Sequence, residues 1–326
     1  MRKLTVLVAI LLFAGLALAG AQAKTVVAYT AHEDDIIAGM VPLFEKETGY
    51  KLEFVKLASG DVIKRVKAEA ANPQADVIWS IGGEQLELDN ALLEKYTPKE
   101  WDKIDPVFKV GTNWLPYTGI VNVFIVNTKL VKDADTPKKW GDLTLAKWKG
   151  KISSATPDKS GSAYMQLNNV LLAFKDQGWD VYQGLLTNFF ISTSSGAVPK
   201  YVNDGEALVG ITLEDNAFRY VLGGGPVKIV YPAEGVIAAP DGIALVKGAP
   251  HPAAAKKFID WCLSTGAQNF LVDKMARRPV RVDGKTPAGL PPLNQVKTLP
   301  YNFADAAKNK DAFVKRFTDL RMELGL

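Results

Sequence analysis

The chain of 326 residues contains one cysteine and only two histidines. Cys262 therefore has no partner for an intramolecular disulfide, and its place in an apolar stripe at helical spacing predicts a buried packing thiol. With His32 and His251 as the only imidazoles, no histidine-rich zinc spacing is present. Neither a G-x-S-x-G elbow nor a Walker-type phosphate loop occurs. These absences argue against catalysis, although a hydrolase remains the main alternative class.

The sequence also lacks a dominant charge and any long apolar run beyond its start. It has 39 basic and 35 acidic residues and no basic run with interleaved aromatics, so we expect no nucleic-acid partner. The apolar run Leu4–Ala19 is short for a membrane span. Arg2 and Lys3 precede it and the small residues of Ala21–Ala23 follow, a pattern that predicts a signal peptide over residues 1–23, cleaved after Ala23. We expect an exported chain of roughly 300 residues.

The first segment after this leader predicts a β-α-β unit. A β-branched and aromatic run, Thr25–Tyr29, is followed by a helical stripe that begins at Ile36 and ends before Gly49, and a second strand starts at Lys51. In open α/β sheets, ligands bind at the loops that leave the carboxyl ends of the strands. Thr30 and His32 are therefore the first candidate binding residues.

The same order of strand, polar turn and helix recurs along the chain. Hydroxyls and backbone N–H groups at helix starts suit an anion, whereas carboxylates suit sugar hydroxyls or an ammonium group. Each turn also has a purely structural interpretation, as a serine cap or an acidic first turn of a helix. The candidate binding residues in these turns are Ser80, Gly82, Gly83, Ser160, Gly161, Ser162, Ser194, Ser195, Glu214, Asp215 and Glu234.

Three further segments carry predictions of local structure. A leucine-rich helix is predicted over Leu86–Tyr96, and a basic helix from Ala304 to Leu320 closes the chain. The compact basic stretch Arg277–Arg281 is interpreted as a solvated turn.

Several short motifs occur in the order found in one family of transport proteins. They are Phe44–Gly49, Ala75–Val77, Trp148–Ile152, Asn203–Glu206 and Ala254–Asp260. Through them the chain resembles periplasmic solute-binding proteins of ABC importers, in the family that contains the ferric-ion binding proteins. The resemblance implies an α/β, two-lobed type II periplasmic binding protein fold, in which each lobe is a mixed sheet flanked by helices.

The resemblance further implies two crossing segments between the lobes, placed near Gly119 and near Val236–Pro240. It implies an N-lobe of residues 24–118 plus 238–280 and a C-lobe of residues 119–237 plus 281–326. The ligand would be a small polar solute held between the lobes, and the partners would be a membrane permease and its cytoplasmic ATPase. The resemblance implies a periplasmic monomer that needs no cofactor and is not an enzyme.

For the ligand, the resemblance leaves two named candidates, and other small solutes remain open beside them. His32 stands at the position of the histidine that ferric-binding members use, but Glu214 and Asp215 replace their tyrosine pair, so phenolate ligation there is excluded. Because a hard cation can use carboxylates, His32, Glu214 and Asp215 form the metal alternative. Related members bind organic phosphates or phosphonates, which fits the mixture of hydroxyl turns and carboxylates better. The favoured ligand is therefore a sugar phosphate or an aminoalkylphosphonate, and ferric iron is the alternative.

Overall fold

The computed structural model describes residues 24–326, and the predicted signal peptide lies outside these residues. Ten strands form one sheet. Eight of them lie in the hydrogen-bonded order β2-β1-β3-β10-β5-β8-β6-β7, while β4 pairs with β10 and β9 with β5 beside this path. The strands are β1 (Thr25–Thr30), β2 (Lys51–Lys56), β3 (Val77–Gly82), β4 (Leu93–Glu94), β5 (Leu115–Asn127), β6 (Ile152–Ser154), β7 (Phe189–Ile191), β8 (Val209–Leu213), β9 (Val227–Val230) and β10 (Ala238–Val246).

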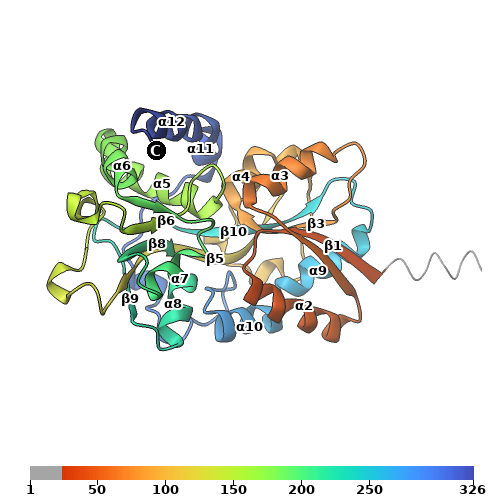
Figure 1. The fold of residues 1–326 in the computed structure, drawn as a ribbon. Coiled ribbons are helices and arrows are strands. Elements are labelled where there is room, and N and C mark those ends of the chain that lie inside the picture. Colours follow the sequence, from red (N-terminus) through yellow and green to blue (C-terminus); the bar gives the residue numbers. More distant parts are fainter. Residues whose placement is uncertain (1–23) are drawn as a thin grey trace, which may run out of the picture.

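Helices cover both faces of each half of this curled sheet, so the molecule has two lobes (Figure 1). The N-lobe is built on β1, β2 and β3, and the C-lobe on β6, β7 and β8. The helices are α2 (Asp34–Thr48), α3 (Ser59–Ala68), α4 (Gly83–Leu88), α5 (Gly161–Phe174), α6 (Gly178–Thr187), α7 (Val198–Asn203), α8 (Glu214–Leu222), α9 (Pro252–Cys262), α10 (Thr265–Met275), α11 (Phe303–Lys308) and α12 (Lys310–Glu323). This confirms the predicted two-lobed α/β class.

The N-lobe sheet is parallel from β2 through β1 to β3, as the opening β-α-β pattern predicts. Its faces are packed separately. One apolar cluster joins α2, α9 and α10 to the sheet through residues such as Phe44 and Phe258, and the other lies beneath α3 around Val62. Cys262 is buried in the first cluster, which confirms the predicted packing thiol.

The C-lobe repeats this arrangement around β6 and β8. Helices α5, α6 and α12 pack on one face through residues such as Leu167, Leu185 and Phe317. Helices α7 and α8 pack on the other face around Val202 and Ala217. The carboxyl ends of strands from both lobes thereby open toward the line between them.

Two long strands, β5 and β10, connect the lobes. Residues 115–121 of β5 pair with β10, whereas residues 122–127 pair with β8 and β9. Strand β10 also pairs with β3 of the N-lobe. All thirteen residues of β5 are buried, which explains its largely apolar sequence. Gly119 lies within β5 and Pro240 within β10, and the predicted lobe boundaries at these positions remain a proposal.

Local sequence signals fix several helix ends as predicted. Gly49 ends α2 in the left-handed conformation at φ 70°, and its N–H donates to the carbonyl oxygen of Glu45. The hydroxyl of Ser160 caps α5 by accepting from the N–H of Ala163. A basic helical stretch closes the chain, but the single helix predicted from Ala304 to Leu320 is divided at Asn309 into α11 and α12.

Two local predictions are wrong. The helix predicted over Leu86–Tyr96 ends at Leu88, because Leu93 and Glu94 pair with the far end of β10 instead. The stretch Arg277–Arg281 is not solvated. Arg277, Arg278 and Arg281 are each at most 6% exposed, because carboxylates far away in the sequence surround their guanidinium groups.

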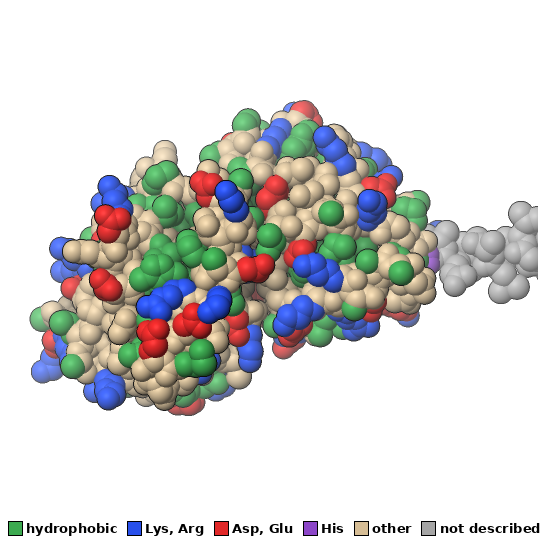
Figure 2. Space-filling view, turned by 90° about the horizontal axis from the view of Figure 1, so that it is seen from above, with side chains coloured by type: hydrophobic (Ala, Val, Ile, Leu, Met, Phe, Trp, Pro, Cys, Tyr) green, Lys and Arg blue, Asp and Glu red, His purple; other side chains and the backbone are tan. Residues whose placement is uncertain are grey.

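Among residues 24–326, no helix combines the length and the apolar character needed to cross a membrane. The space-filling view shows acidic and basic side chains interspersed over the visible face, in keeping with the balanced composition (Figure 2).

Candidate functional site

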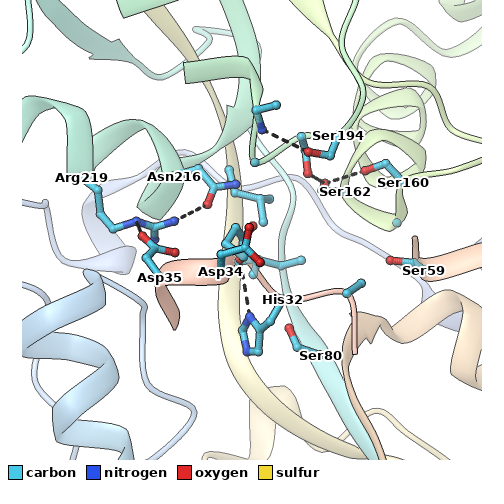
Figure 3. A pocket seen from close by; sticks show the side chains of 18 of the residues that line it. His32, Asp34, Asp35, Ser59, Ser80, Ser160, Ser162, Ser194, Asn216 and Arg219 are labelled. Atoms are coloured by element: carbon cyan, nitrogen blue, oxygen red, sulfur yellow. Dashed lines mark hydrogen bonds and ion pairs between the residues drawn. The ribbon is translucent and has the colours of Figure 1, made fainter. Parts of the chain in front are cut away.

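A cavity of about 1130 Å³ lies between the lobes (Figure 3). The N-lobe contributes the loop after β1, the start of α3 and the end of β3. The C-lobe contributes the starts of α5 and α8 and the loop after β7. The cavity is therefore lined by the strand-to-helix turns of both lobes, as the sequence pattern predicts.

At the C-lobe wall, three serine hydroxyls form a chain at the start of α5. The Oγ atoms of Ser160 and Ser162 are 3.0 Å apart, and the hydroxyl of Ser162 donates to Ser195 Oγ at 2.7 Å. The N–H groups of Gly161 and Ser162 precede the first intrahelical hydrogen bond, so no helix carbonyl accepts from them. Hydroxyls and free N–H groups at the positive end of a helix of fourteen residues suit a bound anion.

On the opposite wall, Ser80 lies in the N-lobe strand β3, two residues before its end, in a strained conformation. Its φ of 58° lies in the left-handed region, which is uncommon for a residue other than glycine. Its hydroxyl donates to Asp241 of β10. Strain of this kind persists where the surrounding structure enforces it, commonly at ligand sites.

The floor of the cavity is held by a buried arginine. The guanidinium of Arg277 lies 2.9 Å from Asp215 Oδ2, donates to Asp241 Oδ2 at 3.0 Å and faces Glu33 Oε2 at 3.4 Å. Burial alone would lower the pKa of Arg277, but the charges of these three carboxylates more than offset it and raise that pKa. Arg277 remains charged, and it ties both lobes to the crossing strand β10.

Glu33 is ionised for the reciprocal reason. Burial opposes its charge, yet the neighbouring His32 ring and the guanidinium of Arg277 hold the pKa of its carboxyl well below the ordinary value. The site therefore keeps a permanent carboxylate in the first loop, beside an arginine that already has two other carboxylate partners.

His32, from the same loop, is enclosed by aromatic rings. Its imidazole meets Trp79 and Tyr117 edge-on at ring-centroid distances of 4.8 and 5.4 Å. Among the described residues Nε2 has no hydrogen-bond partner, and Nδ1 lies 3.5 Å from Glu33 Oε2. Burial lowers the pKa of His32, so the ring is neutral at physiological pH.

The structure brings eight of the predicted binding residues together around the cavity. These are His32, Ser80, Gly82, Ser160, Gly161, Ser162, Ser194 and Ser195. The other five lie outside its lining. The hydroxyl of Thr30 accepts from the His32 N–H, and Gly83 packs against Trp114 and Phe303.

The predicted carboxylates outside the lining all have protein partners. Glu214 accepts two hydrogen bonds from Arg278, at 2.7 and 2.8 Å, while Asp215 pairs with Arg277. Glu234 accepts from the backbone N–H of Trp140. The residues described hold no group of three or more histidine, cysteine or acidic side chains placed to bind a metal ion. The donor set of the metal alternative is therefore not assembled.

Sequence reasoning missed several residues that line the cavity. Those with charged or amide side chains are Glu33, Asp34, Asp35, Lys56, Lys159, Asn203, Asn216, Arg219, Asp241 and Arg277. Glu33, Asp34 and Asp35 directly follow His32 in the sequence, and this place beside the first candidate binding residues was the signal that could have included them. Arg277 and Asp241 carry no local signal, because their partners are far away in the sequence.

Glycines let the two lobes touch beside the cavity. A Cβ atom at Gly161 of α5 would lie 3.1 Å from both the N and Cα atoms of Gly82 at the end of β3. Backbone atoms cannot move aside as the end of a side chain can. These two glycines therefore permit the close approach of the lobes seen here.

We expect Gly161→Ala to lower the affinity for every ligand about tenfold, because the added methyl group holds the lobes apart. A tenfold loss of affinity corresponds to about 1.4 kcal/mol. The ligand-free melting temperature should not fall, since alanine suits the first helical position better than glycine. Titration calorimetry measures the affinity. Gly266→Ala, in the first turn of α10 with no neighbour within 4 Å, is the matched control. Equal affinities for both variants would contradict the role of this contact.

Residues 40–290 match the family described as bacterial extracellular solute-binding protein. The chain belongs to this family. Family members of this kind are the substrate-binding components of ABC transporters, and the relatives found are solute-binding transport proteins rather than enzymes. A solute-binding role agrees with a cavity between two lobes.

Three comparisons describe what this family member is similar to. It is 30% identical over 290 residues to a putative 2-aminoethylphosphonate-binding periplasmic protein of Salmonella typhimurium, with 84% of each chain covered. It is 25% identical over 329 residues to an Fe(3+)-binding periplasmic protein of Serratia marcescens, covering 94% of this chain and 93% of the other. The periplasmic binding protein AfuA from Actinobacillus pleuropneumoniae, solved with exogenous fructose-6-phosphate bound, superposes with a TM-score of 0.85 at 25% identity, covering 91% and 98% of the two chains.

Proposed function

We propose that this solute-binding protein captures an organic phosphate or phosphonate in the periplasm and delivers it to the permease of an ABC importer. The observation that carries the ligand class is the start of α5, where Ser160, Ser162 and Ser195 hydroxyls and two free N–H groups face the cavity. The names of the Salmonella and Actinobacillus relatives, one with an aminophosphonate and the other with a sugar phosphate, support the same class.

The N-lobe side of the cavity supports a ligand with a second, polar part. Glu33, Asp34 and Asp35 line it on the N-lobe side. Carboxylates repel a phosphate but accept hydrogen bonds from an amine or from sugar hydroxyls. A solute with an anionic group at one end and an amine or a polyol at the other suits both walls.

Delivery requires export and a transporter. The predicted signal peptide supports a periplasmic location, and the similarity to periplasmic proteins agrees with it. The permease and its cytoplasmic ATPase are the proposed partners, and the binding protein is proposed to act as a monomer.

A thermal-shift panel tests the ligand class. The chain from Lys24 onward is unfolded and refolded to remove bound ligand, then melted with 2-aminoethylphosphonate, fructose-6-phosphate, inorganic phosphate, fructose and ferric citrate. A ligand at 100 times its dissociation constant adds about 2.7 kcal/mol, which raises the melting temperature by roughly 5–10 °C for a chain of this size.

We expect a shift with at least one phosphorus-containing solute and none with its phosphorus-free parent. A shift with ferric citrate alone would contradict the proposal and favour the iron alternative, for which the similarity to the Serratia protein is the supporting observation.

A further inference from the structure

Asn216, which the sequence analysis did not single out, presents an unused hydrogen-bond donor to the cavity. It lies in the first turn of α8, is 1% exposed and belongs to the cavity lining. Its Nδ2 group has no hydrogen-bond partner among residues 24–326. A buried amide donor without a partner costs free energy, so a ligand that accepts from it gains an interaction that the empty protein lacks.

The orientation of this amide is fixed by Arg219, one turn further along α8. A guanidinium can only donate hydrogen bonds, and Arg219 donates to Asn216 Oδ1 at 2.9 Å. The oxygen must therefore face Arg219, which turns the NH₂ group away from it and toward the centre of the cavity (Figure 3).

Arg219 is itself held from the opposite lobe. Its Nε lies 3.0 Å from Oδ2 of Asp35 in α2, and one terminal nitrogen donates to the carbonyl oxygen of Met275 at the end of α10. Asp35 and Met275 belong to the N-lobe, whereas Arg219 and Asn216 belong to the C-lobe. Within the C-lobe, Arg219 also donates to Asp215 Oδ2 of its own helix at 3.1 Å. The contact from Asp35 exists only when the lobes are close together.

We propose that Asn216 is a ligand-contacting residue whose Nδ2 donates to an acceptor oxygen of the captured phosphate or phosphonate solute, and that the Asp35–Arg219 pair orients this amide as the lobes close. The inference rests on the proposed function for the identity of the solute. It adds a neutral donor on the α8 side of the cavity to the serine hydroxyls on the α5 side, so that the two helix starts of the C-lobe bind different parts of one ligand.

Titration calorimetry with 2-aminoethylphosphonate and fructose-6-phosphate tests the ligand contact. For whichever probe the wild type binds, we expect Asn216→Ala to lower the affinity about tenfold. Asn216→Asp should lower this affinity further, because the substitution replaces the donor by a second, negatively charged acceptor. The new carboxylate can still pair with Arg219. Ligand-free melting curves establish that both variants are folded. Unchanged affinity in Asn216→Ala, or tighter binding by Asn216→Asp, would overturn the inference.

The orienting role of Asp35 has a separate test. Asp35→Asn should lower the affinity for the same probe about threefold and make this affinity less sensitive to salt. Asp61→Asn is the matched control, because Asp61 pairs with Lys64 within α3, is about as exposed as Asp35 and lies outside the cavity lining. The affinity of this variant for the probe should equal that of the wild type. Equal affinities of Asp35→Asn and the wild type would overturn the orienting role.

The two levels of proposal fail in different ways. If the wild type binds neither phosphorus-containing probe but binds ferric citrate, the proposed function fails, and the same Asn216 variants titrated with ferric citrate decide whether this residue contacts ligand at all. If the wild type binds a phosphorus-containing probe and the variants match it, only the inference about Asn216 fails.

Discussion

Replacing Arg277 by methionine is expected to lower the free energy of unfolding by about 3–5 kcal/mol, because it leaves two buried carboxylates and the partly buried Glu33 around an uncharged side chain. Asp215, Asp241 and Glu33 all face the guanidinium that the variant removes. For a chain of this size the melting temperature should fall on the order of 10 °C. Denaturant unfolding of the ligand-free protein at neutral pH measures the loss.

The loss should depend on pH in a defined direction. In the wild type the folded-state pKa of Glu33 lies below its unfolded value of 4.5, so its contribution to stability is present above that pH and is lost as the pH falls through the folded pKa. Without Arg277, one of the charges that lower the pKa of Glu33 is gone, so this pKa shifts back toward its ordinary value and the variant loses less stability on acidification. The difference between wild type and variant should therefore narrow below about pH 4.5.

Arg281→Met is the matched control, since Arg281 is equally buried in the same stretch. Its partners Glu100 and Asp283 are 47% and 46% exposed and can return to water when the arginine is lost. The free energy of unfolding should therefore fall less in this variant, by about 1–2 kcal/mol. Equal losses for the two variants would contradict the account of Arg277 as the centre of a buried charge cluster.

Ser162→Asp is expected to abolish high-affinity binding of a phosphate or phosphonate while leaving the fold as stable as before or more so. A carboxylate in the first turn of α5 interacts favourably with the helix dipole and can accept from the hydroxyls of Ser160 and Ser195. The same charge repels a bound anion by about 3 kcal/mol at a separation of 5 Å and an effective dielectric constant of 20. Affinity should fall at least a hundredfold.

Opposite changes in stability and affinity distinguish this result from general damage. Titration calorimetry gives the affinity, and the ligand-free melting temperature gives the stability. Ser264→Asp is the control, because Ser264 caps α10 outside the cavity in the way that Ser160 caps α5. It should leave binding unchanged. Unaltered affinity of Ser162→Asp would remove the α5 start from the anion site.

Local sequence signals predicted the parts of the fold that depend on neighbouring residues. Apolar spacing located α2, a glycine located the end of α2, and the serine turn at Ser160 marked the start of α5. The helix expected through Leu93 failed because pairing with a distant strand outweighed its leucine-rich composition.

The same distinction between local signals and distant partners applies to the residues of the candidate site. The serine and glycine turns could be found because each follows a strand and precedes a helix. The sequence could not show that Glu214 and Asp215 lie outside the cavity lining, because they pair with Arg278 and Arg277, more than sixty residues later in the chain. Asn216 was missed for a different reason: Arg219 is only three residues later in the same helix, but the sequence does not show which side of the Asn216 amide is free.

The most direct measurement is a crystal structure of the protein bound to the phosphorus-containing solute that gives the largest thermal shift. The account predicts the phosphorus atom at the start of α5, with its oxygens accepting from the N–H groups of Gly161 and Ser162 and from the hydroxyls of the serine chain. A closed complex with the phosphorus against Arg219 and Lys56 on the opposite side of the cavity, and with the serine hydroxyls bonded only to one another, would contradict it.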